Sequence, residues 1–480
     1  MNAKAHDASI LNEADRWRSR DLAVLWHPCT QMREHLSHGA AADGRHGDAL
    51  PLLPVARGEG AWLVGHDGSR TLDAVSSWWT NLFGHAEPRI AEAVARQART
   101  LEQVILAGCS HPPAVELAER LLAIAPRQDG RDPLAKVFYA DNGSAGVEVA
   151  LKMAFHWFRN RGDEPRRTRF VSLHNSYHGE TIGALSVGDI PLYRRVYAPL
   201  LLEPLFAPSP DAFNARPGQS PAACAEEAAD ALAHLLDEHA GEVCALILEP
   251  RVQCAGGMRM HDPVYLRRVR ELCDVHGVFL IADEIAVGFG RTGTMFACEQ
   301  AGIQPDLLCL SKGLTGGFLP LCAVLATQAI YDGFLDDSRE RAFLHSHSYS
   351  GNPLACAAAL ASLDIFDSDN VLARNRETAA KMAQLATPFA NHPLVADVRQ
   401  AGMILAIELH PEPGAREDGN AVEIANLRGP RMYRAALDRG VLLRPLGDVL
   451  YWMPPYCIDD DQLALLADAT RAAIEAAGAA

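Results

Sequence analysis

Four short apolar runs of this chain lead into polar residues that can do chemistry. In chain order, these residues are Gly143 with Ser144, Tyr177, Asp283 and Lys312. Each has an ordinary explanation by itself: a helix N-cap in a permissive turn, a packed ring, a capped strand end and a solvated lysine. Together they indicate something more specific, because a phosphate cradle, an aromatic ring, a carboxylate and a primary amine are the parts that hold pyridoxal phosphate.

We predict one role for each of these groups. The amides of Gly143 and Ser144, at the start of a helix, favour a phosphate. Tyr177 covers the face of the pyridine ring, and Asp283 keeps a proton on the ring nitrogen. Lys312 ends its strand because its amine must reach the cofactor's aldehyde from a desolvated place. The predicted catalytic residues are therefore Lys312, Asp283 and Tyr177.

These groups meet only if the apolar runs are strands of one sheet. The runs are apolar throughout or nearly so, as strands covered on both faces must be. They lie at 136–140, 169–173, 243–248, 278–282 and 307–310. Between the third and the fourth, Asp262 as N-cap, Pro263 and Gly277 mark out a crossover helix. Open α/β sheets bind ligands beyond the carboxyl ends of their strands, which is where the polar groups lie.

The pattern predicts an α/β fold with a large domain built on a mostly parallel sheet. Five apolar residues after the first strand recur at helical spacing and predict a helix packed on this sheet. They are Val147, Ala150, Leu151, Ala154 and Phe158. The end of the chain mixes helices with short strands at 403–409 and 441–446, which suits a smaller α+β domain.

We predict three segments along the chain. Residues 1–75 contribute to the small domain, 76–345 form the large cofactor-binding domain, and 346–480 form the C-terminal small domain. Polar or proline-rich stretches predict loop insertions. These stretches are 38–48, 204–223 and 411–420.

The composition of the 480 residues argues against several classes of protein. Hydrophobic residues make up 49% and charged residues 22%, as in ordinary globular proteins. The formal net charge of -16 repels nucleic acid and anionic membranes. The first residues lack an apolar signal core and no run is long enough to span a bilayer, so we expect a cytoplasmic protein. The 11 cysteines show no paired spacing, so we expect neither disulfides nor a metal site.

Longer motifs resemble a known family. The stretch from EPRVQCAGG at 249 to SKGLTGG at 317 is similar to the fold-type I pyridoxal-phosphate enzymes of the class III aminotransferase group, and the resemblance covers nearly the whole chain. Within that group, four motifs resemble the biotin-pathway branch. They are WHPCTQM at 26–32, SSWW at 76–79, GGMRM at 256–260 and RPLGDVLYWMPPY at 444–456. The resemblance implies transfer of an amino group from S-adenosylmethionine to 8-amino-7-oxononanoate, giving 7,8-diaminononanoate.

The resemblance also implies substrate-binding residues. Trp78 lines the substrate site beside Tyr177 and Lys312. Neighbours on a strand point to opposite faces, so of Trp78 and Trp79 one can be core while the other forms a pocket wall. Arg444 anchors the substrate carboxylate with a bidentate fork, and Arg291 is a weaker contact.

The resemblance further implies a homodimer. HSHSYSGNP at 345–353 is similar to a family segment that reaches across the dimer interface to the partner's phosphate. Ser346 is expected to contact substrate, and His347 with Ser348 the phosphate, where close relatives often carry Pro-Thr. Cys29 stands where the best-known members have a tyrosine that touches the ketone substrate and stacks on the donor's adenine. Lysine as the amino donor is therefore an open alternative.

Two other functions compete with this interpretation. A related ω-aminotransferase could use another amine, and a non-catalytic dimer could keep the fold as a binding module. The presence of Lys312 and Asp283 argues against the second. A Rossmann-type dehydrogenase is disfavoured, because no GxGxxG follows an early strand.

Overall fold

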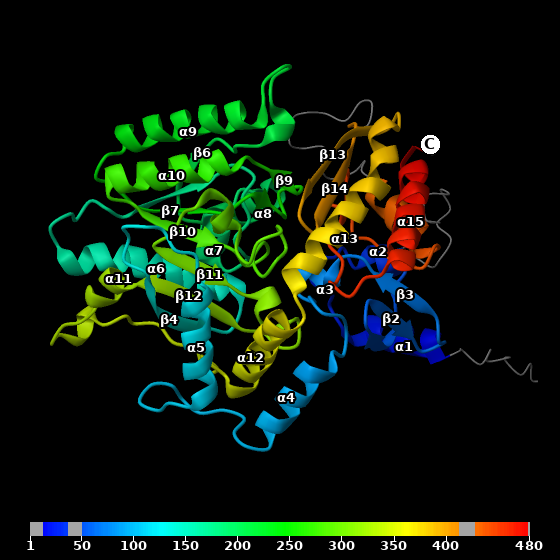
Figure 1. Ribbon diagram of the computed structural model, residues 1–480, viewed down its shortest axis with the longest axis horizontal. Coiled ribbons are helices and arrows are strands. Elements are labelled where there is room, and N and C mark those ends of the chain that lie inside the picture. Colours follow the sequence, from blue (N-terminus) through cyan, green and yellow to red (C-terminus); the bar gives the residue numbers. More distant parts are fainter. Residues whose placement is uncertain (1–12, 37–49, 412–427, 479–480) are drawn as a thin grey trace, which may run out of the picture.

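The structure, a computed structural model, describes residues 13–36, 50–411 and 428–478 (Figure 1). Its centre is a seven-stranded sheet in the order β4-β12-β11-β10-β7-β5-β6. These strands are β4 Leu134–Ala140, β5 Arg169–Leu173, β6 Leu205–Ala207, β7 Val243–Leu248, β10 Phe279–Asp283, β11 Leu307–Leu310 and β12 Cys322–Thr327. All five predicted strands are confirmed.

The sheet is parallel except for one strand. β12 pairs antiparallel with both β11 and β4, while β10, β7, β5 and β6 pair in parallel. Neither β12 nor β6 was predicted. β6 lies inside the stretch 204–223, which was expected to be a loop insertion, so that prediction was wrong for residues 205–207 and for 221–223, where a helix begins.

Helices cover both faces of the large sheet, which explains its continuously apolar strands. Leu246 and Leu280 face one side, where they join a core cluster with residues of α5, α9, α10 and α12. Ile247 and Ile281 face the other side and pack with α6. These helices are α5 Pro112–Ile124, α6 Gly143–Arg161, α9 Pro221–Glu238, α10 Pro263–His276 and α12 Pro353–Ser368. A strand between two helical layers has no polar face, so its residues form an unbroken apolar run in the sequence.

The two predicted helices begin and end for identifiable reasons. Asp262 caps α10 by accepting a hydrogen bond from the Val264 amide, and Gly277 ends it in the left-handed region. Asn142 caps α6 through the Ala145 amide. The five residues expected on the buried face of α6 are all buried. The start of α6 is thereby fixed beside the end of β4.

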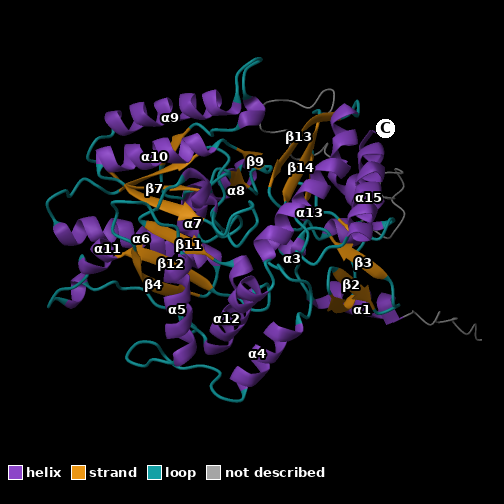
Figure 2. Cartoon of the chain, in the orientation of Figure 1, coloured by secondary structure: helices purple, strands orange, loops and turns teal. Residues whose placement is uncertain are grey.

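A smaller part of the molecule draws on both ends of the chain (Figure 2). One sheet has the order β1-β2-β3-β15 and another β13-β14-β16. Their strands are β1 Val55–Glu59, β2 Trp62–Gly65, β3 Arg70–Asp73, β13 Val395–Ala401, β14 Ile404–Leu409, β15 Val441–Leu442 and β16 Val449–Trp452. β15 pairs in parallel with β3, so the N-terminal and C-terminal segments share one sheet.

Shorter elements complete the described part of the chain. The other helices are α1 Glu13–Val24, α2 Arg33–Leu36, α3 Ser76–Trp79, α4 Pro88–Ala98, α7 Ile182–Ser186, α8 Pro191–Tyr197, α11 Gln328–Asp332, α13 Val371–Ala386, α14 Arg428–Leu437 and α15 Asp460–Gly478. A two-stranded ribbon consists of β8 Val252–Gln253 and β9 Arg259–Met260. The expected insertions at 38–48 and 411–420 lie outside the described residues, except for residue 411.

Residues 76–79 do not form the expected strand. They make the left-handed turn α3, in which Trp78 has φ 70° and Trp79 has φ 72°. Asp73 stabilises this turn by accepting hydrogen bonds from the amide (3.0 Å) and hydroxyl (2.7 Å) of Ser77. The two rings still separate, because Trp79 is 4% exposed and Trp78 is 40% exposed.

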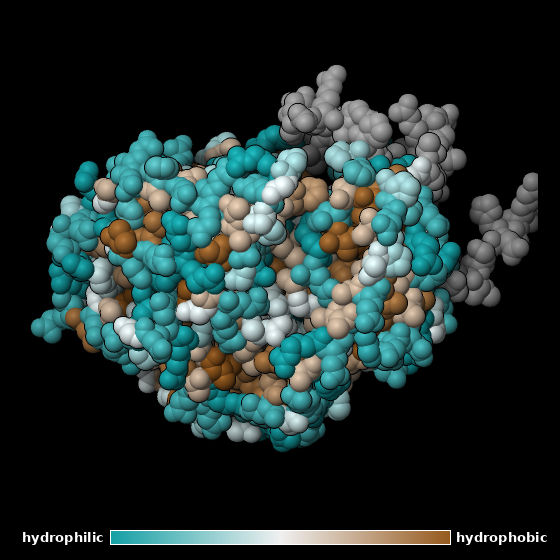
Figure 3. Space-filling view, turned by 45° about the horizontal axis from the view of Figure 1, so that its top comes forward, coloured by the Kyte–Doolittle hydropathy of each residue, from teal (hydrophilic) through white to brown (hydrophobic). Residues whose placement is uncertain are grey.

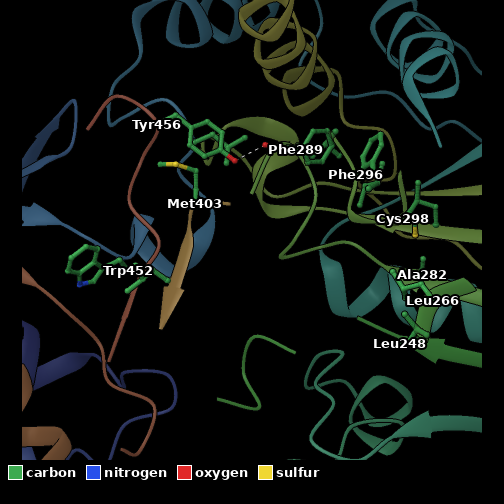
Figure 4. Packing of buried hydrophobic residues seen from close by; sticks show 14 of the residues in the cluster. Leu248, Leu266, Ala282, Phe289, Phe296, Cys298, Met403, Trp452 and Tyr456 are labelled. Atoms are coloured by element: carbon green, nitrogen blue, oxygen red, sulfur yellow. Dashed lines mark hydrogen bonds between the residues drawn. The ribbon is translucent and has the colours of Figure 1, made fainter. Parts of the chain in front are cut away.

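One hydrophobic cluster extends from the large sheet into the smaller part. Figure 4 shows Tyr456 and Met403 packed near Phe289, and the Tyr456 hydroxyl donates a 2.7 Å hydrogen bond to the Phe289 carbonyl. The face shown in Figure 3 is mainly hydrophilic, with scattered hydrophobic patches. No described helix has the length and apolar character needed to cross a membrane.

Candidate active site

A cavity of about 1060 Å³ lies beyond the carboxyl ends of β4, β5, β10 and β11. Eight of the predicted site residues line it, and they come from separate parts of the chain. They are Cys29, Trp78, Gly143, Ser144, Tyr177, Asp283, Lys312 and Arg444. The sheet topology accounts for the inner members of this set, because parallel strands end at the same edge.

Lys312 lies at the inner end of the cavity. It follows β11 after Ser311, whose hydroxyl donates a 2.6 Å hydrogen bond to the Leu321 carbonyl. The backbone of Lys312 is left-handed, with φ 44°, a conformation that is costly for a residue with a side chain. Its Nζ lies 4.4 Å from the centre of the Trp79 ring, and burial lowers the pKa of the amine. A neutral, nucleophilic amine is thus favoured at this position.

Asp283 forms a buried pair with His178. Asp283 Oδ2 lies 2.7 Å from His178 Nδ1, and Oδ1 accepts a hydrogen bond from the Ile285 amide at 3.1 Å. His178 is 2% exposed, and among the described residues its Nε2 has no hydrogen-bond partner. The histidine fixes the carboxylate of Asp283 at the cavity wall.

The start of α6 forms a cradle at one side of the cavity. As the first amides of the helix, those of Gly143 and Ser144 have no acceptor within it. The Ser144 hydroxyl accepts hydrogen bonds from the amides of Glu180 (3.1 Å) and Thr181 (3.0 Å). A Cβ on Gly179 would lie 2.3 Å from Ser144 Oγ, so only glycine allows this close approach. Helix start and loop are therefore held as one unit.

Tyr177 is fixed through its backbone and its hydroxyl. Its amide donates to Glu249 Oε2 at 3.0 Å, and Glu249 Oε1 accepts from the Cys254 amide at 3.0 Å. The Tyr177 hydroxyl donates to Glu180 Oε1 at 3.1 Å. Burial raises the pKa of the Glu249 carboxyl to about 7.

The mouth of the cavity is built from more distant segments. Arg444, which is exposed, follows β15 and places its guanidinium carbon 4.7 Å from the centre of the Trp78 ring. Cys29, in the loop after α1, donates its thiol to Glu180 at 3.5 Å and accepts from the Tyr193 hydroxyl at 3.4 Å. Arg444, the Glu180 carboxylate and the hydroxyls of Tyr177 and Tyr193 therefore lie together at the opening, and Arg259, Glu408 and Asp448 also line the cavity.

Arg291 does not line the cavity. It is 1% exposed, and its guanidinium donates to the carbonyls of Pro454 (2.8 Å) and Asn81 (3.2 Å). It also lies 4.9 Å above the Tyr456 ring. Its observed contacts join the large sheet to the smaller part, and contact with substrate stays a prediction.

Ser346, His347 and Ser348 do not line the cavity either. His347 lies beside the α6 cradle, because its Nδ1 is 3.8 Å from Oδ1 of Asp141, the residue that precedes the N-cap Asn142. Both of these atoms are buried, and neither has a hydrogen-bond partner in the described part of the chain. Contact of this segment with a partner's phosphate stays a prediction.

Among the cavity residues that were not predicted as site residues, four contact predicted ones through hydrogen bonds. They are His178, Glu180, Tyr193 and Glu249. Glu249 directly follows the strand 243–248, so the strand-end argument could have found it. His178 and Glu180 share a short motif with Tyr177 but were given no role. No local signal distinguishes Tyr193, whose contact with Cys29 spans 164 positions of the chain.

These residues fit pyridoxal phosphate. The amine of Lys312 is desolvated, the Asp283 carboxylate is held by a buried histidine, and the cradle has no room for a larger residue. At Gly143 an added Cβ would lie 3.0 Å from Ile285 Cγ2. The arrangement can bind an anion at one end, hold a ring between Tyr177 and the opposite wall, and present an amine and a carboxylate to that ring.

Comparisons with known proteins agree with this chemistry. The family model described as aminotransferase class-III matches residues 44–474. The chain is 44% identical over 465 residues to the adenosylmethionine-8-amino-7-oxononanoate aminotransferase of Nitratidesulfovibrio vulgaris, covering 96% of this chain and 81% of the relative. The crystal structure of the Methanocaldococcus jannaschii enzyme of the same name aligns with a TM-score of 0.84 and 35% identity, covering 96% and 99% of the two chains. An ω-transaminase of Pseudomonas jessenii in complex with PMP aligns with a TM-score of 0.85 and 28% identity, covering 96% and 98%.

Proposed function

This chain belongs to the class III aminotransferases, and we propose that it transfers an amino group from S-adenosylmethionine to 8-amino-7-oxononanoate in biotin biosynthesis. Its cofactor is pyridoxal 5'-phosphate, on which the family depends. The observation that carries the proposal is that the desolvated amine of Lys312 and the paired carboxylate of Asp283 line the same cavity as Arg444. The matching relatives carry the name of this reaction.

Each residue has a proposed part in binding. The amides of Gly143 and Ser144 bind the phosphate, and Tyr177 stacks on the ring. Arg444 binds the carboxylate of the acceptor, and Trp78 orients this arginine from below. Asp283, held by His178, keeps a proton on the ring nitrogen.

Proton movement is assigned to Lys312. Pyridoxal phosphate, when bound, supplies an aldehyde for amines and a ring that takes up the electrons released at the substrate carbon. Lys312 Nζ would take the proton from the amine-bearing carbon of the donor. In the second half it returns a proton to the former ketone carbon of the acceptor. The lowered pKa of the Lys312 amine favours the neutral form that accepts this proton.

A single-turnover assay tests this function. The purified holoenzyme is mixed with S-adenosylmethionine, the change in cofactor absorbance is followed, and 8-amino-7-oxononanoate is then added. We expect an absorbance change on addition of the donor and its reversal on addition of the acceptor, with 7,8-diaminononanoate identified by mass. A protein that shows no visible absorbance change on borohydride reduction would instead be a non-catalytic binding module.

Lysine as donor is the second candidate, and Glu180 is the observation that favours it. Lysine has two amino groups. While one reacts at the inner end, the other can pair as an ammonium group with a carboxylate at the mouth. The same assay separates the two donors, because it is run with each in turn. A first phase with lysine alone would assign the donor to lysine and leave the acceptor unchanged.

We also propose that the enzyme is a cytoplasmic homodimer whose residues 346–348 complete the partner's site. Large hydrophobic side chains flank this segment, with Leu344 64% and Tyr349 61% exposed. Mixed dimers of Lys312→Ala and Ser348→Ala subunits test the crossing. If the segment crosses, one site carries both lesions and the other neither, so activity returns well above that of either variant. If it does not cross, each site carries one lesion and no activity returns.

The domain division is a proposal as well. We assign residues 1–75 and 346–480 to the small domain and 76–345 to the large one. The pairing of β3 with β15 supports the joining of the two terminal segments. At the border, the Ser76 hydroxyl donates a 2.7 Å hydrogen bond to the Met453 carbonyl.

A further inference from the structure

Five aromatic side chains line the cavity in the described part of the chain. They are Trp78, Trp79, Tyr177, His178 and Tyr193. Trp78 has one face under the guanidinium of Arg444, and Trp79 lies under the amine of Lys312. His178 is held by Asp283, and Tyr177 is assigned to the cofactor ring. Trp78 therefore keeps one face free, whereas Tyr193 makes no ring or cation contact with any described residue and has no part in holding the cofactor.

Tyr193 stands at the mouth of the cavity, on α8. It is partly exposed, whereas Trp79 and His178 are 4% and 2% exposed at the inner end. A flat group that is too large for the inner end therefore meets Tyr193 first. Glu180 lies one hydrogen bond beyond Cys29, so a carboxylate is close to the same ring.

A chain of hydrogen bonds fixes the position of this ring. The Tyr193 hydroxyl donates to Cys29 Sγ at 3.4 Å, and that thiol donates to Glu180 Oε1 at 3.5 Å. The Tyr177 hydroxyl donates to the same Glu180 oxygen at 3.1 Å. Held at its hydroxyl, the ring loses less conformational entropy when a ligand stacks on it. Cys29 is thus a positioning residue for Tyr193.

We propose that Tyr193 is the surface on which the purine of a nucleoside-bearing amino donor stacks, while Glu180 attracts the donor's positive charge. The inference rests on the proposed function, which names S-adenosylmethionine as donor. That molecule carries both a planar base and a sulfonium cation, and an aromatic ring beside a carboxylate suits the pair. The acceptor, 8-amino-7-oxononanoate, carries no ring, so Tyr193 affects the donor half-reaction alone.

The test compares Tyr193→Leu with Tyr193→Phe and with a matched control, Tyr197→Leu. Tyr197 lies on the same helix, is 45% exposed and does not line the cavity. Single-turnover half-reactions are measured with S-adenosylmethionine, with lysine and with 8-amino-7-oxononanoate. Inhibition by 5'-methylthioadenosine, which has the base but no aliphatic amine to transfer, reports binding of the purine independently of transamination.

We expect Tyr193→Leu to raise the half-saturating concentration of S-adenosylmethionine about three- to tenfold and to weaken inhibition by 5'-methylthioadenosine equally. Tyr193→Phe, which keeps the ring, should lose less, and Tyr197→Leu nothing. The half-reaction with 8-amino-7-oxononanoate should be unchanged in all three variants. This pattern separates stacking from a general loss of structure.

Three outcomes would overturn the proposal. If Tyr193→Leu leaves S-adenosylmethionine and 5'-methylthioadenosine unaffected while the parent reacts, Tyr193 has no such role and the proposed function stands. If Tyr193→Leu weakens the acceptor half-reaction equally, the effect is structural. If the parent reacts with lysine but neither reacts with S-adenosylmethionine nor binds 5'-methylthioadenosine, the proposed donor and the stacking surface both fail.

Discussion

The inner end of the cavity and its mouth are built in different ways. At the inner end, Lys312, Asp283 and His178 lie at or just beyond strand ends of one sheet and are largely shielded from solvent. At the mouth, Cys29 and Tyr193 come from the N-terminal segment and from α8, and their contacts join distant parts of the chain. We propose that the inner end carries the groups that any reaction on this cofactor needs, and that the residues of the mouth select the substrate.

Interactions between charges are stronger at the inner end than at the mouth, because the inner end is shielded from solvent. Two unit charges 4 Å apart interact by about 1 kcal/mol in water but by about 4 kcal/mol at the effective dielectric of a protein site. The pair of Asp283 and His178 is buried, whereas Arg444 and Cys29 are exposed. Substitutions should therefore cause their largest losses at the inner end and graded changes at the mouth.

The largest effect is expected for Lys312→Ala. Without the amine, no group takes the proton from the donor carbon, so transamination should be abolished. The phosphate and ring contacts remain, so the variant should stay folded and bind free cofactor weakly. Steady-state turnover, thermal melting and cofactor titration measure the three properties, with Lys381→Ala, a surface lysine paired with Asp460, as control. Turnover without added amine would falsify the assignment of Lys312.

Asp283→Asn should cost several orders of magnitude in the rate of the donor half-reaction. A neutral amide no longer favours the protonated ring nitrogen, so electrons released at the substrate carbon are poorly stabilised. The hydrogen bonds to His178 and the Ile285 amide can survive, so cofactor binding should change less than the rate. The comparison uses single-turnover kinetics beside cofactor titration. A rate within a few-fold of the parent would make Asp283 structural.

At the mouth, Arg444→Ala should raise the KM for 8-amino-7-oxononanoate by roughly tenfold to a hundredfold, the range for a hydrogen bond to a charged group. The kcat should fall much less, because Arg444 is proposed to bind the substrate carboxylate and takes no part in the proton transfer. Arg439→Ala is the matched control, since that arginine pairs with Asp468 on the surface. An unchanged KM for the acceptor would remove Arg444 from the substrate site.

The difference between the two ends also explains what could be predicted from the sequence. The strand ends were predictable, because buried parallel strands are unbroken apolar runs and their carboxyl ends meet at one edge. Gly143, Asp283 and Lys312 therefore came together as expected. The family resemblance supplied Arg444 and Trp78, which no local pattern places at the cavity.

Long-range contacts could not be predicted in the same way. The left-handed turn at residues 76–79 contains no glycine, and it persists because Asp73 and the Met453 carbonyl hold it from other segments. Strand β12 was missed although its residues are apolar. Its antiparallel pairing inside a mostly parallel sheet cannot be recognised from the residues of the strand alone. Tyr193 was missed because its partner Cys29 is defined only by the fold.

Cys29→Tyr should have the smallest effect of these substitutions. The thiol lies 3.4 Å from the Tyr193 hydroxyl and 3.5 Å from Glu180, so a phenol there must displace one of them. A well-placed aromatic pair contributes about 0.5–1.5 kcal/mol, so the affinity for S-adenosylmethionine should change by roughly tenfold at most. If Tyr193 already supplies the stacking surface, the added ring helps little.

The half-reactions of parent and Cys29→Tyr with S-adenosylmethionine and with lysine give the measurement, and Cys109→Tyr, at an exposed cysteine outside the cavity, is the control. A parent that transaminates only lysine, with a variant that gains activity toward S-adenosylmethionine, would change the donor assignment. Such a result would change only the roles assigned to the residues at the mouth. The acceptor and the chemistry of Lys312 would stand, because they depend on the inner end and on Arg444.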